Sequence, residues 1–189
     1  FGTGSVIPPL AVARRPAREV VRPMHLEHRA VVDIMQGLIP EFIPCWDGRS
    51  YQIPRYLKNR RIPPILCQLY DIGFATEGRF HDRIILPVVT GDECIDYTAR
   101  STVADEEIRY LSGPYAGGMV YGWWQAKWLL ESSPNRIDGP QDFVVIVEGP
   151  FDVLAFARVG IPAIGLLGKS SLGREKIELE KGVFNRIAM

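Results

Sequence analysis

The chain has 189 residues, of which 47% are hydrophobic and 23% are charged, a composition typical of a globular protein with a real core. Its 22 lysines and arginines balance 22 acidic residues, so any affinity for nucleic acid has to come from local patches of charge. No apolar run approaches the ~20 residues that cross a bilayer, which excludes a transmembrane helix. The cysteines, Cys45, Cys67 and Cys94, form no CxxC pair, which argues against a zinc ribbon or a disulfide framework and favours a reducing cytoplasm.

The first 50 residues are predicted to form an extended arm followed by one helix. Four prolines interrupt residues 1–23, whereas residues 24–38 carry apolar residues at helical spacing. His25 and His28 share one face of this helix, as a metal pair would. No third ligand stands out nearby, so exposed histidines are the favoured interpretation.

Residues 51–135 are predicted to form a basic subdomain with a β-hairpin. The sequence "RIPP" separates two short helices, and a hairpin follows over residues 83–101. A glycine-rich loop then leads into an aromatic-rich helix whose tryptophans we expect in the core. The densest basic patch, "RYLKNRR", is equally typical of a solvated helix face and of a phosphate-binding surface. It contains Arg55, Lys58, Arg60 and Arg61.

The register of the hairpin follows from its turn. A two-residue loop at residues 91–92 pairs Thr90 with Glu93, and the same register places Arg83 directly opposite Arg100. Both arginines then project from an open face, and the opposite face is apolar. That face holds Ile84, Leu86 and Val88 against Ala99, Tyr97 and Ile95. A bulge at Pro87 would shift this register.

Two arginines side by side repel each other, which leaves two interpretations. In the first, they are surface arginines that splay into water or pair with acids such as Asp82 or Asp96. In the second, they form a clamp for phosphate oxygens. If they form a clamp, replacing either with alanine should weaken nucleic-acid binding and leave the stability of the fold almost unchanged.

Residues 142–189 are predicted to begin an α/β module, in the order strand, helix, strand, helix and the start of another strand. Glu148 follows the first strand, where functional groups of parallel sheets gather, and Gly149-Pro150 turns the chain into the helix. Glu148 and Asp152 are candidate Mg²⁺ ligands, although each has a simpler interpretation: Glu148 as a hydrogen-bond acceptor for a loop, Asp152 as a complement to the helix N-terminus. Lys169, in "GKSS", is a candidate anion contact, but the full P-loop pattern is absent.

The order of several short motifs resembles the RNA-polymerase domain of bacterial and phage DNA primases. The motifs are "YLKNRRI", "IGFATEGRFHDRIILPV", "DYTARS", "RYLSG", "VYGWWQAK", "VEGPFDVLAFARVGI" and "LLGKSSL". They run from about Tyr56 to Leu172, and the last ones resemble the opening of a Toprim fold. The fold implied is α+β, with a helical and antiparallel-sheet subdomain followed by a truncated α/β Toprim-like module.

The resemblance implies template-directed joining of ribonucleotides with Mg²⁺ or Mn²⁺. It places Glu148 in the acidic metal site and assigns Arg83 and Arg100 to phosphates of template or nucleotide. The partners implied are single-stranded DNA, ribonucleotides, and a replicative helicase or a complementary C-terminal segment, with no membrane. No zinc is expected within this chain, because nothing here supplies the ligands of the zinc-binding domain that precedes the polymerase domain in the family.

Two departures from the family pattern leave alternatives open. The family usually has a lysine shortly before "YG", where this chain has "YAGGMV", and its Asp-x-Asp pair belongs to a strand that would follow Met189. We therefore expect no primer synthesis by these residues alone. The alternatives are a non-catalytic nucleic-acid-binding module, a subunit of a split primase, and a nuclease of the Toprim type.

Overall fold

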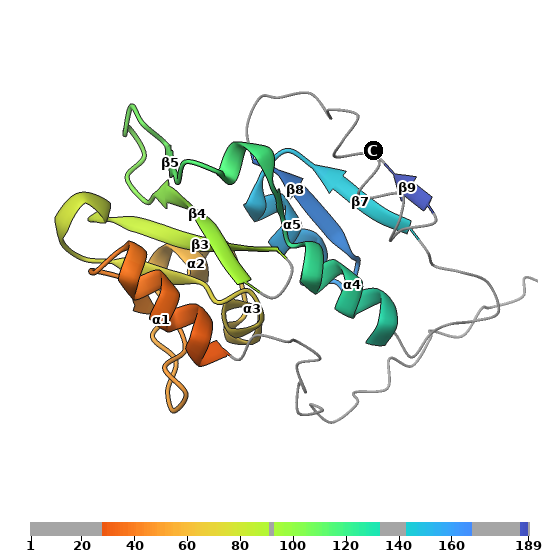
Figure 1. Ribbon diagram of the computed structural model, residues 1–189, viewed down its shortest axis with the longest axis horizontal. Helices are drawn as coiled ribbons and strands as arrows, with labels where there is room; N and C mark the ends of the chain where they lie inside the picture. Colours follow the sequence, from red (N-terminus) through yellow and green to blue (C-terminus); the bar gives the residue numbers. More distant parts are fainter. Residues whose placement is uncertain (1–27, 91–92, 133–142, 168–185, 189) are drawn as a thin grey trace, which may run out of the picture.

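Two β-sheets organise the chain (Figure 1), for which the computed structural model describes residues 28–90, 93–132, 143–167 and 186–188. The strands of the first sheet are β1 (Ile43–Pro44), β2 (Gly73–Ala75), β3 (Arg83–Thr90), β4 (Glu93–Ser101) and β5 (Tyr110–Ser112), which are antiparallel and lie in chain order. Those of the second sheet are β6 (Val120–Tyr121), β7 (Phe143–Val147), β8 (Ala163–Leu166) and β9 (Arg186–Ala188). Its order is β6-β8-β7-β9, and β7, β8 and β9 are parallel. The predicted α+β class is confirmed.

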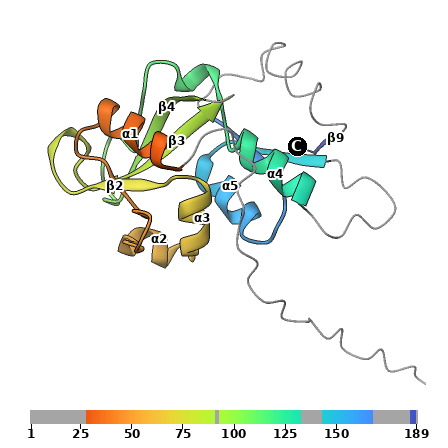
Figure 2. The same cartoon turned by 60° about the horizontal axis from the view of Figure 1, so that its bottom comes forward.

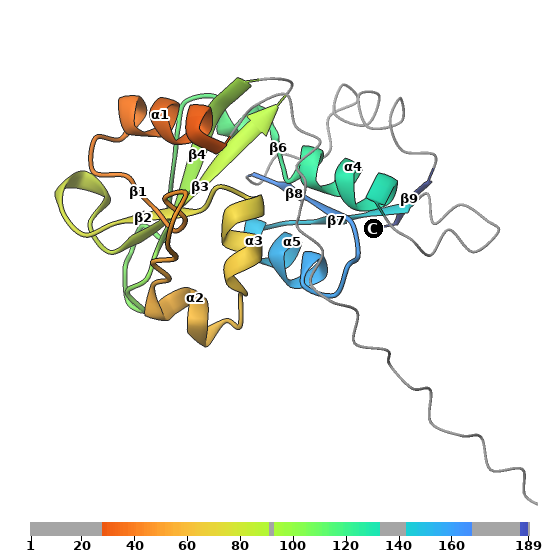
Figure 3. The same ribbon diagram turned by 90° about the horizontal axis from the view of Figure 1, so that it is seen from below.

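The helices cover both faces of each sheet. They are α1 (His28–Leu38), α2 (Arg55–Asn59), α3 (Pro64–Leu69), α4 (Trp123–Ser132) and α5 (Pro150–Ala157), with short 3-10 turns η1 (Gly78–Phe80) and η2 (Ala116–Gly118). Helix α1 packs on one face of the first sheet, while α2 and α3 lie against the other (Figure 3). Helix α4 packs on one face of the second sheet, and α5 on the opposite face. In the described part of the chain, no helix has the length and apolar character needed to span a membrane.

One apolar cluster joins the two sheets. It contains Ile84 and Leu86 of β3, Leu57 of α2, and Val153 and Leu154 of α5, all of them buried. Helices α3 and α5 accordingly lie side by side (Figure 2). The regions predicted as residues 51–135 and 142–189 therefore pack directly on each other, and the boundary between them stays a prediction.

The predicted hairpin is present, but its predicted register is wrong by one residue. Thr90 pairs with Glu93 as expected, and a bulge between Val88 and Val89 then shifts every pair beyond it. Arg83 consequently lies opposite Ser101, and Arg100 lies opposite Ile84. Because neighbouring residues of a strand point to opposite faces, the shift places the two arginines on different faces of the sheet. Neither face is open, since α1 covers one and α2, α3 and α5 cover the other.

Most of the other predicted elements are confirmed. The two helices flanking "RIPP" are α2 and α3, and each is followed by a residue in the left-handed conformation, Arg61 (φ 57) and Asp71 (φ 51). The tryptophans of α4 are partly buried and pack against the apolar clusters. The strands expected around residues 143–148, 162–167 and 185–189 are β7, β8 and β9. The predicted arm, His25, the helix at 172–181 and Lys169 lie outside the described residues.

His28 is a fixed partner of the core rather than an exposed histidine. Its Nδ1 lies 2.5 Å from Oδ1 of the buried Asp71, and its Nε2 lies 2.7 Å from the carbonyl oxygen of Trp46. These contacts tie the start of α1 to the end of α3. The expectation of a solvent-exposed histidine at this position is therefore wrong.

Two buried tyrosines make the stability of the fold sensitive to alkali. Tyr70 and Tyr121 stack at 5.6 Å between ring centroids, and their hydroxyls have no hydrogen-bond partner among the described residues. Burial raises the pKa of both phenols above the ordinary value of 10.0, so the folded state keeps them protonated where the unfolded chain ionises. Ionisation of the two phenols therefore does not change the free energy of unfolding below pH 10. Above pH 10, each phenol lowers the free energy of unfolding by about 1.4 kcal/mol per pH unit.

We expect the variant with both Tyr70→Phe and Tyr121→Phe to lose stability more gradually above pH 10 than the parent chain. At pH 8 the variant should be as stable as the parent, because neither hydroxyl contributes a hydrogen bond. Urea unfolding between pH 8 and pH 11 measures the free energy of unfolding at pH 8 and its slope above pH 10. Equal slopes for parent and variant above pH 10 would contradict this account.

Candidate nucleic-acid interface

Two arginines and three aromatic rings lie close together between α2, the end of β4, the start of β5 and the start of α5. We call this group the basic–aromatic cluster; it contains Tyr56, Arg60, Arg100, Tyr110 and Phe151. The Cζ atom of Arg60 lies 4.8 Å from the ring centroids of both Tyr56 and Phe151. The Cζ atom of Arg100 lies 4.8 Å from the ring centroid of Tyr110. Tyr110 links the two halves, because Arg100, Tyr56 and Arg60 all act on the pKa of its phenol. The cluster therefore brings two cations that are 40 residues apart in the sequence to the same tyrosine.

Arg100 reaches the cluster because of the shifted register. Its side chain leaves β4 on the same face as Ile84, which is the face covered by α2 and α5. The guanidinium Nε is buried and has no hydrogen-bond partner among the described residues. A buried N–H donor without a partner is costly, so the Arg100 Nε–H would gain stability by donating a hydrogen bond to an oxygen.

The two phenols of the cluster add hydroxyl donors. Burial raises the pKa of Tyr110 above its ordinary value of 10.0, although the neighbouring Arg100 guanidinium acts in the opposite direction. Tyr110 therefore stays protonated at neutral pH. The hydroxyl of Tyr56 is buried and, within the described part of the chain, has no hydrogen-bond partner. Two guanidinium groups and two phenol hydroxyls form a donor set that matches the oxygens of a phosphate.

Arg83 does not join this cluster. It is buried, and its guanidinium donates to the carbonyl oxygens of Ile108 (3.0 Å) and Arg109 (3.5 Å) and lies 3.7 Å from Glu106. These contacts hold the loop between β4 and β5. The expected clamp of Arg83 and Arg100 side by side is therefore wrong in its geometry, and a phosphate-binding role for Arg83 stays a prediction.

Glu148 lies where the sequence predicted it. It directly follows β7 at the carboxyl end of the strand, is exposed, and has no ion pair among the described residues. The chain then enters α5 through Gly149 and Pro150. A Cβ atom on Gly165 of β8 would lie 3.1 Å from Val153 and 3.4 Å from Gly149, so this glycine lets the start of α5 approach the sheet.

Asp152 is close to Glu148 in the first turn of α5. A Cβ atom on Gly149 would lie 3.4 Å from the Asp152 carboxylate, which therefore lies against the turn that carries Glu148. Among the described residues, no three His, Cys, Asp or Glu side chains gather into a metal-binding group. The two carboxylates nevertheless fit Mg²⁺, which is commonly held by one or two carboxylates and otherwise by waters and substrate phosphates.

The loop "GPYAGG" lies at the same edge of the second sheet. A Cβ atom on Gly117 would lie 4.0 Å from the carbonyl oxygen of Leu167, just beyond β8. The buried carboxylate of Asp96 fixes the loop by accepting a hydrogen bond from the backbone N–H of Tyr115 at 2.6 Å. Gly113 packs so closely on this carboxylate that a Cβ atom would overlap it. As a result, Tyr115 projects with 67% of its surface exposed, and Ala116 is buried.

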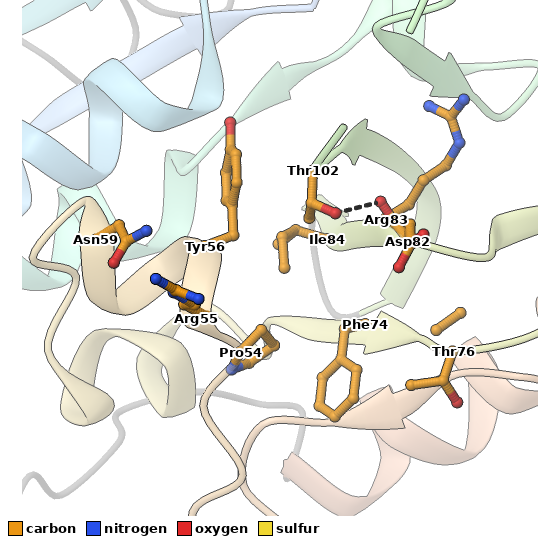
Figure 4. Close-up of a pocket in the computed structure, with 11 residues that line it drawn as sticks. Pro54, Arg55, Tyr56, Asn59, Phe74, Thr76, Asp82, Arg83, Ile84 and Thr102 are labelled. Carbon is orange, nitrogen blue, oxygen red and sulfur yellow. Dashed lines mark hydrogen bonds between the residues drawn. The ribbon is translucent and has the colours of Figure 1, made fainter. Parts of the chain in front are cut away.

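A pocket of about 420 Å³ adjoins the cluster through Tyr56 (Figure 4). Its apolar surface comes from Pro54, Phe74 and Ile84, and polar groups surround it. The polar lining residues are Arg55, Asn59, Thr76, Asp82 and Thr102; in Figure 4 the guanidinium of Arg83 points away from the other lining side chains. An apolar floor with amide and hydroxyl groups at its rim suits a planar base.

The remaining predicted basic residues are distributed around the cluster. Lys58 and Arg61 are exposed and lie next to Arg60 at the end of α2. Tyr56, Tyr110 and Phe151 are site residues that were not predicted from the sequence. A signal for Tyr56 was present, because "RYLKNRR" places Arg60 four residues after it, the spacing of neighbours on a helix.

Comparison with known proteins gives a consistent result. No family model matches the chain. The DNA primase of Thermotoga maritima is 34% identical over 100 residues, which cover 52% of this chain and 17% of that protein. The DNA primase of Escherichia coli K12 is 24% identical over 168 residues, which cover 82% of this chain and 26% of that protein.

Solved structures show the same fold. A DnaG primase catalytic domain bound to single-stranded DNA superposes with a TM-score of 0.62 and 21% identity over 84% of this chain and 62% of that one. The E. coli primase catalytic core gives a TM-score of 0.59 and 21% identity, covering 70% of this chain and 52% of that one. This chain is similar to the RNA-polymerase domain of DnaG-type DNA primases. It spans about a quarter or less of the length of the curated primases it matches.

Proposed function

We propose that this DnaG-like chain forms part of a DNA primase that joins ribonucleotides on a single-stranded DNA template. The observation that carries the proposal is the basic–aromatic cluster, in which Arg60 and Arg100 both lie near Tyr110 and oppose the rise in its pKa that burial causes, with no carboxylate in salt-bridge contact with either arginine among the described residues. The similarity to primases supports the same assignment.

Each part of the site has a separate role in this proposal. Arg60 and Arg100 bind phosphates of the template or of the nucleotide, with the exposed Lys58 and Arg61 extending the positive surface. The pocket beside Tyr56 accepts a base of the single strand. Glu148, with Asp152 beside it, would hold Mg²⁺ or Mn²⁺, which neutralises charge on the transferring phosphoryl group.

A non-catalytic nucleic-acid-binding module is the second candidate. It is favoured by the absence of a third carboxylate near Glu148 in the part of the chain that the structure describes. Both functions require the same cluster for binding. They differ in whether ribonucleotides are joined.

The test combines binding and synthesis with the full-length gene product. Binding of oligo-dT should weaken with salt, with a slope in log K against log [salt] of roughly −0.7 for each phosphate contacted, and double-stranded DNA of the same length should bind less tightly. Labelled ribonucleotides should be incorporated on a single-stranded template with Mg²⁺ or Mn²⁺ and not without metal. Binding without incorporation would favour the non-catalytic module, and failure to bind single strands would overturn both functions.

A further inference from the structure

Phe151 is placed to orient Arg60. The ring is buried, with 8% of its surface exposed, and packs edge-on against Tyr56 at 5.6 Å between centroids and an interplanar angle of 75°. The two rings form a corner, and the Cζ atom of Arg60 lies 4.8 Å from the centroid of each. A guanidinium held against two ring faces loses much of the rotational freedom of a free arginine.

Nothing else in the described part of the chain fixes the Arg60 side chain. It follows the five-residue helix α2, it is exposed, and no acidic side chain of the described residues forms an ion pair with it. The backbone turns away directly after it, because Arg61 has a left-handed conformation (φ 57). The orientation of the guanidinium therefore depends on Tyr56 and Phe151.

Phe151 also connects two distant parts of the chain. It lies in the first turn of α5, three residues after Glu148, whereas Tyr56 and Arg60 belong to α2. Pro150 and the close approach of Gly149 to Gly165 fix the backbone at this point. The ring thus couples the position of the Arg60 guanidinium to the turn that carries the Glu148 carboxylate.

We infer that Phe151 is a positioning residue, which holds the Arg60 guanidinium toward a phosphate of a single strand bound beside Glu148. This inference rests on the proposed function, since Arg60 must contact the bound strand. Phe151 itself touches no phosphate; it acts through Arg60. An aromatic ring is required at this position, and an aliphatic side chain of similar volume does not replace it.

The variants separate the aromatic contact from packing. Phe151→Leu keeps an apolar side chain and removes the ring, whereas Phe151→Tyr keeps the ring. Phe156→Leu is the matched control, because Phe156 lies on the same helix, packs on the same apolar cluster, and has no arginine over its ring among the described residues. Each change is made in the parent chain and in Arg60→Ala, and oligo-dT binding is measured by fluorescence anisotropy at several salt concentrations.

We expect Phe151→Leu to weaken binding about fivefold and to reduce the salt slope by roughly 0.7, the value for one phosphate contact. Phe151→Tyr and Phe156→Leu should stay within about twofold of the parent, since one keeps the cation–π contact and the other does not touch it. In the Arg60→Ala background, Phe151→Leu should have no further effect. The side-chain Nε–Hε signal of Arg60 in NMR should also move in Phe151→Leu without any DNA, since the ring that shields it is gone.

Three results would overturn the inference. The first is equal weakening by Phe151→Leu with and without Arg60, which would show a purely structural role. The second is parent-like binding by Phe151→Leu while Arg60→Ala binds weakly. The third is an Arg60 Nε–Hε signal that stays in place when the ring is lost. If Phe151→Leu is too unstable for binding studies, the same NMR measurement is made on Phe151→Met. A parent chain that does not bind oligo-dT at all would instead refute the proposed function, and the inference with it.

Discussion

Replacing Arg100 with alanine should weaken binding of single-stranded DNA by about tenfold to a hundredfold. The loss corresponds to one charge-assisted contact to phosphate, which is worth about 1.5–3 kcal/mol. The salt slope should become shallower by roughly 0.7–0.9, the value for one phosphate. Binding of oligo-dT over a range of salt concentrations measures both effects. The free energy of unfolding should fall by only about 1 kcal/mol, because Arg100 loses its contact with the Tyr110 ring while its Nε has no hydrogen bond to lose among the described residues.

Two further arginines serve as controls for Arg100. Arg158→Ala removes the same charge at the far end of α5 and should leave both affinity and salt slope almost unchanged. Arg83→Ala should instead lower the free energy of unfolding by about 2 kcal/mol, because it breaks the hydrogen bonds to the Ile108 and Arg109 carbonyls. A salt slope that changes in Arg83→Ala and not in Arg100→Ala would show that the phosphate contact lies on the other face of the sheet.

Replacing Glu148 with glutamine should lower metal-dependent primer synthesis by at least about a hundredfold in the full-length gene product. The amide keeps the size of the side chain and removes the charge that would hold a divalent cation in the proposed site, an interaction worth several kcal/mol in the transition state. The melting temperature should stay nearly constant, since Glu148 is exposed and has no ion pair among the described residues. Ribonucleotide incorporation and thermal unfolding, measured on the same preparation, test the two statements.

Matched substitutions define what the loss at Glu148 means. Glu107→Gln removes the same charge from an exposed loop and should not affect synthesis. Asp152→Asn should have a smaller effect than Glu148→Gln, because a carboxylate in the first turn of a helix also serves the helix itself. If Glu148→Gln lowers the melting temperature by several degrees, the carboxylate has a structural partner and is not open for metal.

Local patterns were sufficient to predict the long elements of the fold. Alternation gave β3 and β4, the prolines around residue 63 separated α2 from α3, and Gly149-Pro150 marked the start of α5. The strands that were missed, β1, β2, β5 and β6, have only two or three residues, which is too short for any periodicity to appear. Their position depends on partners that are distant in the sequence.

In the site, only the positions that depend on local features could be predicted from the sequence. Glu148 could be placed because a strand end and a turn are local features. The faces of Arg83 and Arg100 could not, because a bulge between Val88 and Val89 depends on how β3 and β4 pack, and one extra residue exchanges the faces of a strand. The role of Phe151 could not be predicted either, because its contact with Arg60 exists only when α2 and α5 pack together.

The central claim is that Arg60 and Arg100 together contact the phosphates of a bound single strand. It is tested most directly by following the arginine side-chain Nε–Hε signals of the chain by NMR while oligo-dT is added. The account predicts that the Arg60 and Arg100 signals move with the same dissociation constant, and that the signals of Arg83 and Arg158 stay in place. Saturation of binding with unchanged Arg60 and Arg100 signals, or with Arg83 moving instead, would contradict it.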